Sequence, residues 1–254
     1  MIRLLCLLLL FATPLTHAEV GIDNLSKGIK EFTAAYQAWD GDLLNSAVET
    51  LRHTSTNATA TSTNYYWLGT ALFHRMLQLQ HAAANPTNKA AAEIAMNDAL
   101  ESLTIAVKLD AHDAESQALL GTLYGMKING SLLQALRFGP RVSKCHEQAL
   151  AFGAENPRVR YLLGTCQFHT AKKPAAWRET LNTLLAAEKL FDAESKITAG
   201  PLEPRWGRSS CLTFIGRTYE MLGEKKQAAD YFRKAISEHP ADQLAKDGLK
   251  RVAE

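Results

Sequence analysis

Apolar residues recur at helical spacing along most of the chain, and residues 209–242 show the pattern most fully. This segment reads SSCLTFIGRTYEMLGEKKQAADYFRKAISEHPAD. The first apolar face follows the i, i+3, i+4, i+7 spacing of an α-helix and comprises Leu212, Ile215, Gly216 and Tyr219. The second face comprises Ala228, Phe232 and Ala235. Gly223 separates the two helices and Pro240 ends the second, so the segment is predicted to form a helical hairpin.

The same local pattern occurs at earlier places in the chain. Residues 66–74 read YWLGTALFH and residues 161–169 read YLLGTCQFH, so six of the nine positions agree. The glycines that align these and two weaker copies are Gly69, Gly121, Gly164 and Gly216. Each follows an apolar residue and the spacing between them varies, which indicates one structural unit repeated with insertions of different length. Ala35 marks an earlier unit, one period of about 34 residues before Gly69.

The unit at 209–242 resembles the tetratricopeptide repeat (TPR) family. The residues that match positions of the family are Ile215, Gly216, Tyr219, Ala228, Phe232, Ala235 and Pro240, whereas Leu212 replaces the frequent Trp. The resemblance implies an all-α fold, a right-handed α-solenoid of about five stacked helical hairpins with insertions and a C-terminal capping helix. The expected units cover residues 22–61, 62–113, 114–156, 157–208 and 209–242, and the capping helix covers 241–254. Stacking would bury apolar faces that a single hairpin leaves exposed.

The N-terminal segment differs from the rest of the chain. Residues 1–18, MIRLLCLLLLFATPLTHA, have the order of a secretory signal peptide, with a charged start at Arg3, an apolar middle and small residues before a cleavage site. The apolar run is shorter than the roughly 20 residues that cross a bilayer. We therefore expect a mature chain that begins near Glu19, is periplasmic or secreted, and is not stably inserted in a membrane. A retained membrane anchor is the alternative.

Composition and charge narrow the expected partners. Hydrophobic residues make up 46% and charged residues 21% of the sequence, an ordinary globular balance. The 28 Lys and Arg residues against 26 Asp and Glu residues give a net charge of +2, which offers no electrostatic footprint for nucleic acid. The sequence also lacks the nucleophile-elbow, P-loop, dinucleotide-binding and zinc-protease motifs. A protein or peptide partner is therefore expected, with no catalytic residues, no cofactor and no metal.

Three cysteines lie outside the predicted signal peptide. Cys145 and Cys166 fall on neighbouring predicted helices, and an exported protein meets an oxidising compartment. We therefore expect these two residues to form a disulfide bond, which leaves Cys211 unpaired.

In the TPR family the first helices of the hairpins line a concave surface. The positions three before, one after and five after the key glycine point into it. In this sequence the resemblance implies a groove lined by Tyr66, Thr70, His74, Thr122, Met126, Tyr161, Thr165, His169 and Arg217. The leading hypothesis is an exported, non-catalytic interaction module or scaffold that binds a peptide or partner protein in this groove. The alternative reading of the repeated Tyr, Thr and His is packing inherited from duplicated units.

Two other classes of function stay open. One is a helical-repeat enzyme, or an accessory subunit of one, with its site in the inter-repeat insertions near Pro140 or Trp206. The other is a small-ligand or metal binder that uses histidines of the groove. His74 and His81 are seven residues apart, whereas metal ligands on one helix more often sit at i and i+4 and need further partners, so a polar surface pair is favoured.

Overall fold

The computed structural model describes residues 17–82 and 85–253, and this part of the chain forms eleven helices. The hairpins pair α1 (His17–Ala38) with α2 (Gly41–Ser55), α3 (Ser62–His81) with α4 (Pro86–Leu109), α5 (Ala114–Ile128) with α6 (Leu132–Gly153), α7 (Pro157–Thr170) with α8 (Pro174–Glu194), and α9 (Arg208–Met221) with α10 (Lys225–Glu238). The last helix is α11 (Gln243–Ala253). The predicted all-α fold of five hairpins and a capping helix is confirmed.

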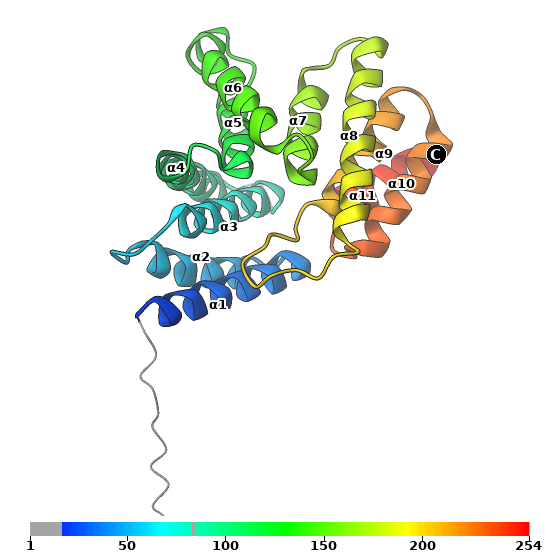
Figure 1. Cartoon of the computed structure of the whole chain (residues 1–254). Helices are drawn as coiled ribbons and strands as arrows, with labels where there is room; N and C mark the ends of the chain where they lie inside the picture. The colour runs from blue at the N-terminus through cyan, green and yellow to red at the C-terminus, as the bar shows by residue number, and fades with distance from the viewer. Residues whose placement is uncertain (1–16, 83–84, 254) are drawn as a thin grey trace, which may run out of the picture.

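The hairpins stack in chain order into a curved solenoid (Figure 1). Within each hairpin the two helices pack along each other, and the second helix of each hairpin also contacts the first helix of the next. The first helices contact one another in sequence, from α1 through α3, α5 and α7 to α9. Helix α11 packs on α9 and α10 and covers the last hairpin. The first helices therefore form the inner layer of the arc and the second helices the outer layer.

The recurring glycines lie at close contacts between the two helices in four of the hairpins. A Cβ atom on Gly69 would lie 2.6 Å from Leu103 of α4, and one on Gly216 would lie 2.8 Å from Phe232 of α10. Gly121 meets α6 and Gly164 meets α8 in the same way. Real Cβ atoms need more than 3 Å, so a larger residue would force the facing side chain or the packing of the two helices to shift. The predicted packing role of these four glycines is confirmed.

Local signals in the turns between helices determine where helices begin. The side chain of Asp40 caps α2 by accepting from the backbone N–H groups of residues 42 and 43 at 2.9 and 3.0 Å. Asn156 caps α7 in the same manner and Pro157 follows at the first helical position. Between α5 and α6, Asn129 and Gly130 adopt φ angles of 41° and 74°, which let the chain reverse within three residues.

Side chains of α1 reach the C-terminal end of the stack. The Tyr36 ring stacks on His239 with centroids 5.3 Å apart, and His239 Nε2 lies 3.0 Å from the carbonyl oxygen of Gln37. The Tyr36 hydroxyl lies 3.4 Å from Oγ of both Ser209 and Ser210, more than 170 positions along the chain. The first and last hairpins are therefore joined across the inner side of the arc.

The predicted signal peptide, residues 1–18, lies outside the described residues except for its last two positions, which open α1. Among residues 17–82 and 85–253, no helix combines the length and the hydropathy that a transmembrane span requires.

Candidate functional site

The inner side of the arc is filled by aromatic side chains that we call the concave cluster. Its members are Phe32, Tyr36, Tyr66, Trp67, His74, Tyr161, Trp206 and His239, and all are buried. His74 is at its centre, with ring centroids 5.2 Å from Phe32, 4.9 Å from Tyr36 and 5.1 Å from Trp206. These rings come from the hairpins and from the segments that follow α8 and α10.

The segment between α8 and α9, residues 195–207, contributes Trp206 to the cluster. Trp206 is only 3% exposed, and its indole Nε1 donates to the Tyr66 hydroxyl at 2.9 Å. Its ring lies 6.5 Å from that of Tyr161. Trp67 in turn donates from Nε1 to the backbone carbonyl of Leu202 at 3.1 Å. The two tyrosines of the nine-residue repeat therefore face the same tryptophan, and an insertion between repeats occupies the space where a groove was expected.

The predicted groove residues would have to be accessible to a partner, and in the structure most of them are not. The buried members are Tyr66, Thr70, His74, Thr122, Tyr161 and Thr165. The physical reason is that Tyr66, His74 and Tyr161 pack against Trp206. His74 also packs on Phe32 of α1, and Thr122 is approached by Cys166 of α7.

The remaining residues of the predicted groove, Met126, His169 and Arg217, are not fully buried. Met126 is half-buried, and His169 is exposed beside Phe214 at 5.8 Å. The Arg217 guanidinium stacks on Phe168 at 4.5 Å and on Phe214 at 4.9 Å. Binding of a partner by these three residues stays a prediction.

A buried ionic network lies beside the concave cluster, and its residues were not predicted from the sequence. Arg158 Nε donates to Glu115 Oε1 at 2.8 Å, and its NH1 donates to Glu194 Oε2 at 3.0 Å. The Arg158 side chain is 4% exposed. Glu115 also accepts a short hydrogen bond from the Tyr66 hydroxyl, and Arg205 of the 195–207 segment pairs with Glu194 at 3.1 Å. The network joins α3, α5, α7 and α8 to the segment that carries Trp206.

Burial shifts the titration of groups in this region. Burial lowers the pKa of His74 from 6.5 to about 4, against a backbone hydrogen bond to Thr70 that acts in the opposite direction. Burial, together with the Glu115 charge, raises the pKa of the Tyr66 hydroxyl well above its usual value. Burial alone would lower the pKa of Arg158, but the neighbouring Glu115 and Glu194 carboxylates outweigh it, and that pKa is raised. The region therefore holds a neutral imidazole and a fully paired guanidinium at neutral pH.

The predicted disulfide bond between Cys145 and Cys166 is wrong, because both thiols are free. Cys145 packs over Gly121 on the side of α5 that faces α6. Cys166 instead approaches the Thr122 hydroxyl at 3.8 Å from α7. The two side chains thus meet α5 at adjacent residues, Gly121 and Thr122, and adjacent positions on a helix point about 100° apart. Within the described ranges no cluster of three or more His, Cys, Asp or Glu residues could hold a metal ion.

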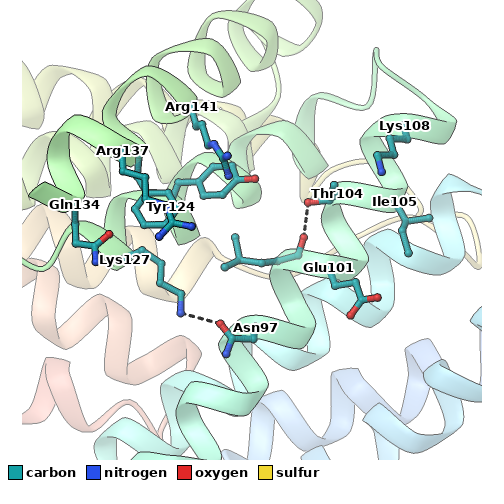
Figure 2. A pocket seen from close by; sticks show the side chains of 12 residues that line it. Asn97, Glu101, Thr104, Ile105, Lys108, Tyr124, Lys127, Gln134, Arg137 and Arg141 are labelled. Atoms are coloured by element: carbon teal, nitrogen blue, oxygen red, sulfur yellow. Dashed lines mark hydrogen bonds between the residues drawn. The ribbon is translucent and has the colours of Figure 1, made fainter.

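A second feature, which we call the basic groove, opens between α4, α5 and α6 (Figure 2). Its volume is about 700 Å³. The α4 wall consists of Asn97, Leu100, Glu101, Thr104, Ile105 and Lys108. The other side consists of Tyr124 and Lys127 from α5 and Gln134, Arg137, Phe138 and Arg141 from α6. One face of each outer helix thus lines the groove, with α5 as its floor.

The groove exists because α4 and α6 each pack on α5, whereas the backbones of α4 and α6 do not come close to one another in the described structure. Helix α6 begins at Leu132, directly after the three-residue turn, and runs for 22 residues, whereas the corresponding helix α10 has 14. The extra turns come from the sequence around Pro140 that was expected to be an insertion. The first turns of α6 carry exposed side chains, and Leu133 is 78% exposed.

Positive charge dominates the basic groove. Lys108, Lys127, Arg137 and Arg141 face a single carboxylate, that of Glu101. None of these four cations forms an ion pair within the described part of the chain. Lys127 instead donates to the side-chain oxygen of Asn97 at 2.7 Å (Figure 2).

Sequence reasoning missed both the ionic network and the basic groove, for a common reason. The partners of Arg158 are 36 and 43 residues away, so no local spacing marks it as buried. The groove residues come from three helices, and the sequence of each helix alone shows only an ordinary solvent-exposed polar face. The one available signal was the pair of insertions near Pro140 and Trp206, because an insertion in a repeat departs from the packing rule. The first extends a wall of the basic groove and the second fills the concave cluster.

Comparisons with known proteins address the architecture. Neither the protein-family models nor the curated proteins gave a match. A thermophilic TPR protein from Thermus thermophilus, known from its crystal structure, is similar with a TM-score of 0.63 at 12% identity, over 92% of this chain and 98% of that chain. YrrB, described as a TPR protein with an unusual peptide-binding site, gives a TM-score of 0.40 at 15% identity over 92% and 97% of the two chains. A tetratricopeptide repeat protein from Parabacteroides merdae gives 0.31 at 16% over 91% and 100%. The first similarity and the hairpin stacking together show that this chain has a TPR-like helical-repeat fold.

Proposed function

We propose that this protein is a non-catalytic interaction module that binds a segment of a partner protein in the basic groove. Helical solenoids expose long surfaces held by a rigid stack, and binding is the common use of such surfaces. The observation that carries the proposal is the contrast between the two faces. The concave cluster has its main hydrogen-bonding and charged groups paired inside the chain, whereas four cations around a groove of about 700 Å³ have no ionic partner among the described residues.

Photo-crosslinking in the source organism tests this proposal. A photoreactive residue at Asn97 or Ile105 would lie in the basic groove, and one at the exposed Gln227 of α10 would lie on a remote surface. We expect both groove positions to capture one common partner, identified by mass spectrometry, and Gln227 to capture none. The identified protein, made in pure form, should then bind the chain in isolation. Equal capture from Gln227, or no capture from the groove, would contradict the proposal.

The module is further proposed to be exported. The support is the order of charged, apolar and small residues in segment 1–18. Fractionation of the source cells should place the protein outside the cytoplasm, and intact-mass analysis should show a chain that begins near Glu19. An intact Met1 on the mature protein would refute export by this route.

A further inference from the structure

We infer that the basic groove recognises an extended, acidic segment whose carboxylates pair with the four cations around it. The inference rests on the proposed function and deepens it, because it names the chemistry of the partner. It is carried by the charges, by the stacked arginines, by an unpartnered amide oxygen and by the length of the groove.

The charges favour an anionic ligand with several separate negative groups. Lys108 lies at one end of the α4 wall, and Arg137 and Arg141 lie on the α6 side, so the cations are spread around the groove and do not converge on one point (Figure 2). Unpaired charges of one sign in a cleft attract a ligand of opposite sign and orient it. A chain of carboxylates fits this distribution better than one phosphate does.

Aromatic rings lie beside the guanidinium groups of Arg137 and Arg141 and orient them for binding carboxylates. The Arg141 guanidinium lies 5.5 Å from the centroid of Tyr124 and 5.8 Å from that of Phe138, and Arg137 lies 5.1 Å from the same Phe138. Stacking on aromatic rings fixes the plane of each guanidinium and leaves its N–H edge open. A fork of this kind binds a carboxylate through two parallel hydrogen bonds.

One further polar group fits an extended ligand. The side-chain oxygen Oε1 of Gln134 is buried, and it has no hydrogen-bond donor in the described structure. An extended peptide presents free backbone N–H groups at regular intervals, whereas a helix uses nearly all of them internally. The lining residues Leu100 and Ile105 offer apolar contact for the side chains between the acidic ones.

The size of the groove sets the length of the segment. The lining residues of α4 run from Asn97 to Lys108, about 16 Å at 1.5 Å per residue. An extended chain rises about 3.3 Å per residue, so the groove accommodates about five residues. Nucleic acid and lipid surfaces fit less well, because the whole chain carries a net charge of only +2.

Fluorescence anisotropy with synthetic peptides tests the inference. The probe is a fluorescein-labelled octapeptide in which glutamate alternates with leucine, and its analogue has glutamine in place of every glutamate. We expect the glutamate peptide to bind the full chain at least about tenfold more tightly than the glutamine peptide, which corresponds to about 1.4 kcal/mol. The affinity should fall as salt rises.

Paired charge reversals locate the site. Arg137→Glu with Arg141→Glu should weaken binding of the glutamate peptide at least about tenfold. The matched control is Lys225→Glu with Lys226→Glu on α10, which changes the net charge equally at exposed positions outside the groove and should leave the affinity within about twofold. Gln134→Leu should weaken binding by about threefold to tenfold, as expected for one lost hydrogen bond. Circular dichroism verifies that each variant is folded.

Several outcomes would overturn the inference. One is equal binding of the glutamate and glutamine peptides, and another is an equal loss in the α10 control. A third is that single-stranded DNA, polyphosphate or phosphatidylglycerol vesicles bind in a groove-dependent way while the glutamate peptide does not. If crosslinks from Asn97 and Ile105 persist when the peptide fails, the acidic chemistry is wrong but the interaction function stands. If both fail, the proposed function is wrong as well.

Discussion

The concave cluster and the basic groove belong to one solenoid, but their charged groups are paired differently. Inside the arc, the Arg158 guanidinium is paired with Glu115 and Glu194 while it is almost fully buried. Outside, α4 and α6 both pack on α5 but stay apart from one another, and Arg137 and Arg141 stay open to solvent without an ion pair in the described chain.

The difference follows from the cost of desolvation. A charge removed from water needs a partner and hydrogen bonds, so the inner face is stable only if each ionic group is matched within the chain. A charge in an open groove keeps its water and needs no partner until a ligand displaces that water. The paired charges of the inner face are therefore expected to matter for stability, and the open charges of the outer groove suit the proposed binding role.

Replacing Arg158 with Met should give the largest loss of stability. The change leaves the Glu115 and Glu194 carboxylates buried without their common partner, and breaking a buried pair in this way costs about 3–5 kcal/mol. Urea unfolding followed by circular dichroism measures the loss. Arg178→Met is the matched control, because Arg178 pairs with Glu224 at the surface and such pairs contribute under about 1 kcal/mol. Similar losses in the two variants would show that the network is not a stabilising element.

Replacing Trp206 with Ala should destabilise the protein by about 3 kcal/mol, at the lower end for large aromatic residues because the 195–207 segment is able to collapse partly into the space. The half-buried Phe138 of the basic groove provides the comparison, since Phe138→Ala removes a ring that keeps contact with solvent and should cost less. The difference in unfolding free energy measures how far the two regions differ in burial. A larger loss for Phe138→Ala would reverse the contrast.

His74 of the concave cluster makes the free energy of unfolding depend on pH in the acidic range. Its pKa is about 4 in the folded protein and about 6.5 when unfolded, so only the unfolded state binds the proton between these values. The stabilisation is complete above about pH 6.5 and is lost as the pH falls toward 4, by up to about 3 kcal/mol.

Unfolding free energies measured between pH 4 and 7 test this dependence. His74→Gln should flatten the slope, whereas His53→Gln, at an exposed position of α2, should leave it unchanged. An unaltered slope in His74→Gln would show that other groups control acid sensitivity.

The sequence allowed the hairpins to be predicted because their determinants are local. Leu212, Ile215 and Gly216 share a helix face, and the contact of Gly216 with Phe232 closes within one unit. The filling of the concave face could not be predicted in this way, because Trp206 meets Tyr66 across 140 positions. The same nine-residue repeat places His74 in the buried centre and His169 at the exposed rim. A motif therefore predicts a position in the repeat but not the burial of that position.

The smallest expected effect concerns glycines in the two regions. A Cβ atom on Gly125, inside α5 beside the groove residue Tyr124, would meet no atom within 4 Å, whereas one on Gly164 would collide with Leu184 of α8. Gly125→Ala should therefore stabilise the protein by about 0.5–1 kcal/mol through helix propensity alone. Gly164→Ala should gain the same propensity but lose more through displaced packing, so its net effect should be destabilising. Thermal unfolding of the two variants gives the sign of each change. A stabilising Gly164→Ala would mean that the hairpins tolerate separation, and a destabilising Gly125→Ala would mean that the end of α5 beside the groove is as tightly constrained as the interior of the stack.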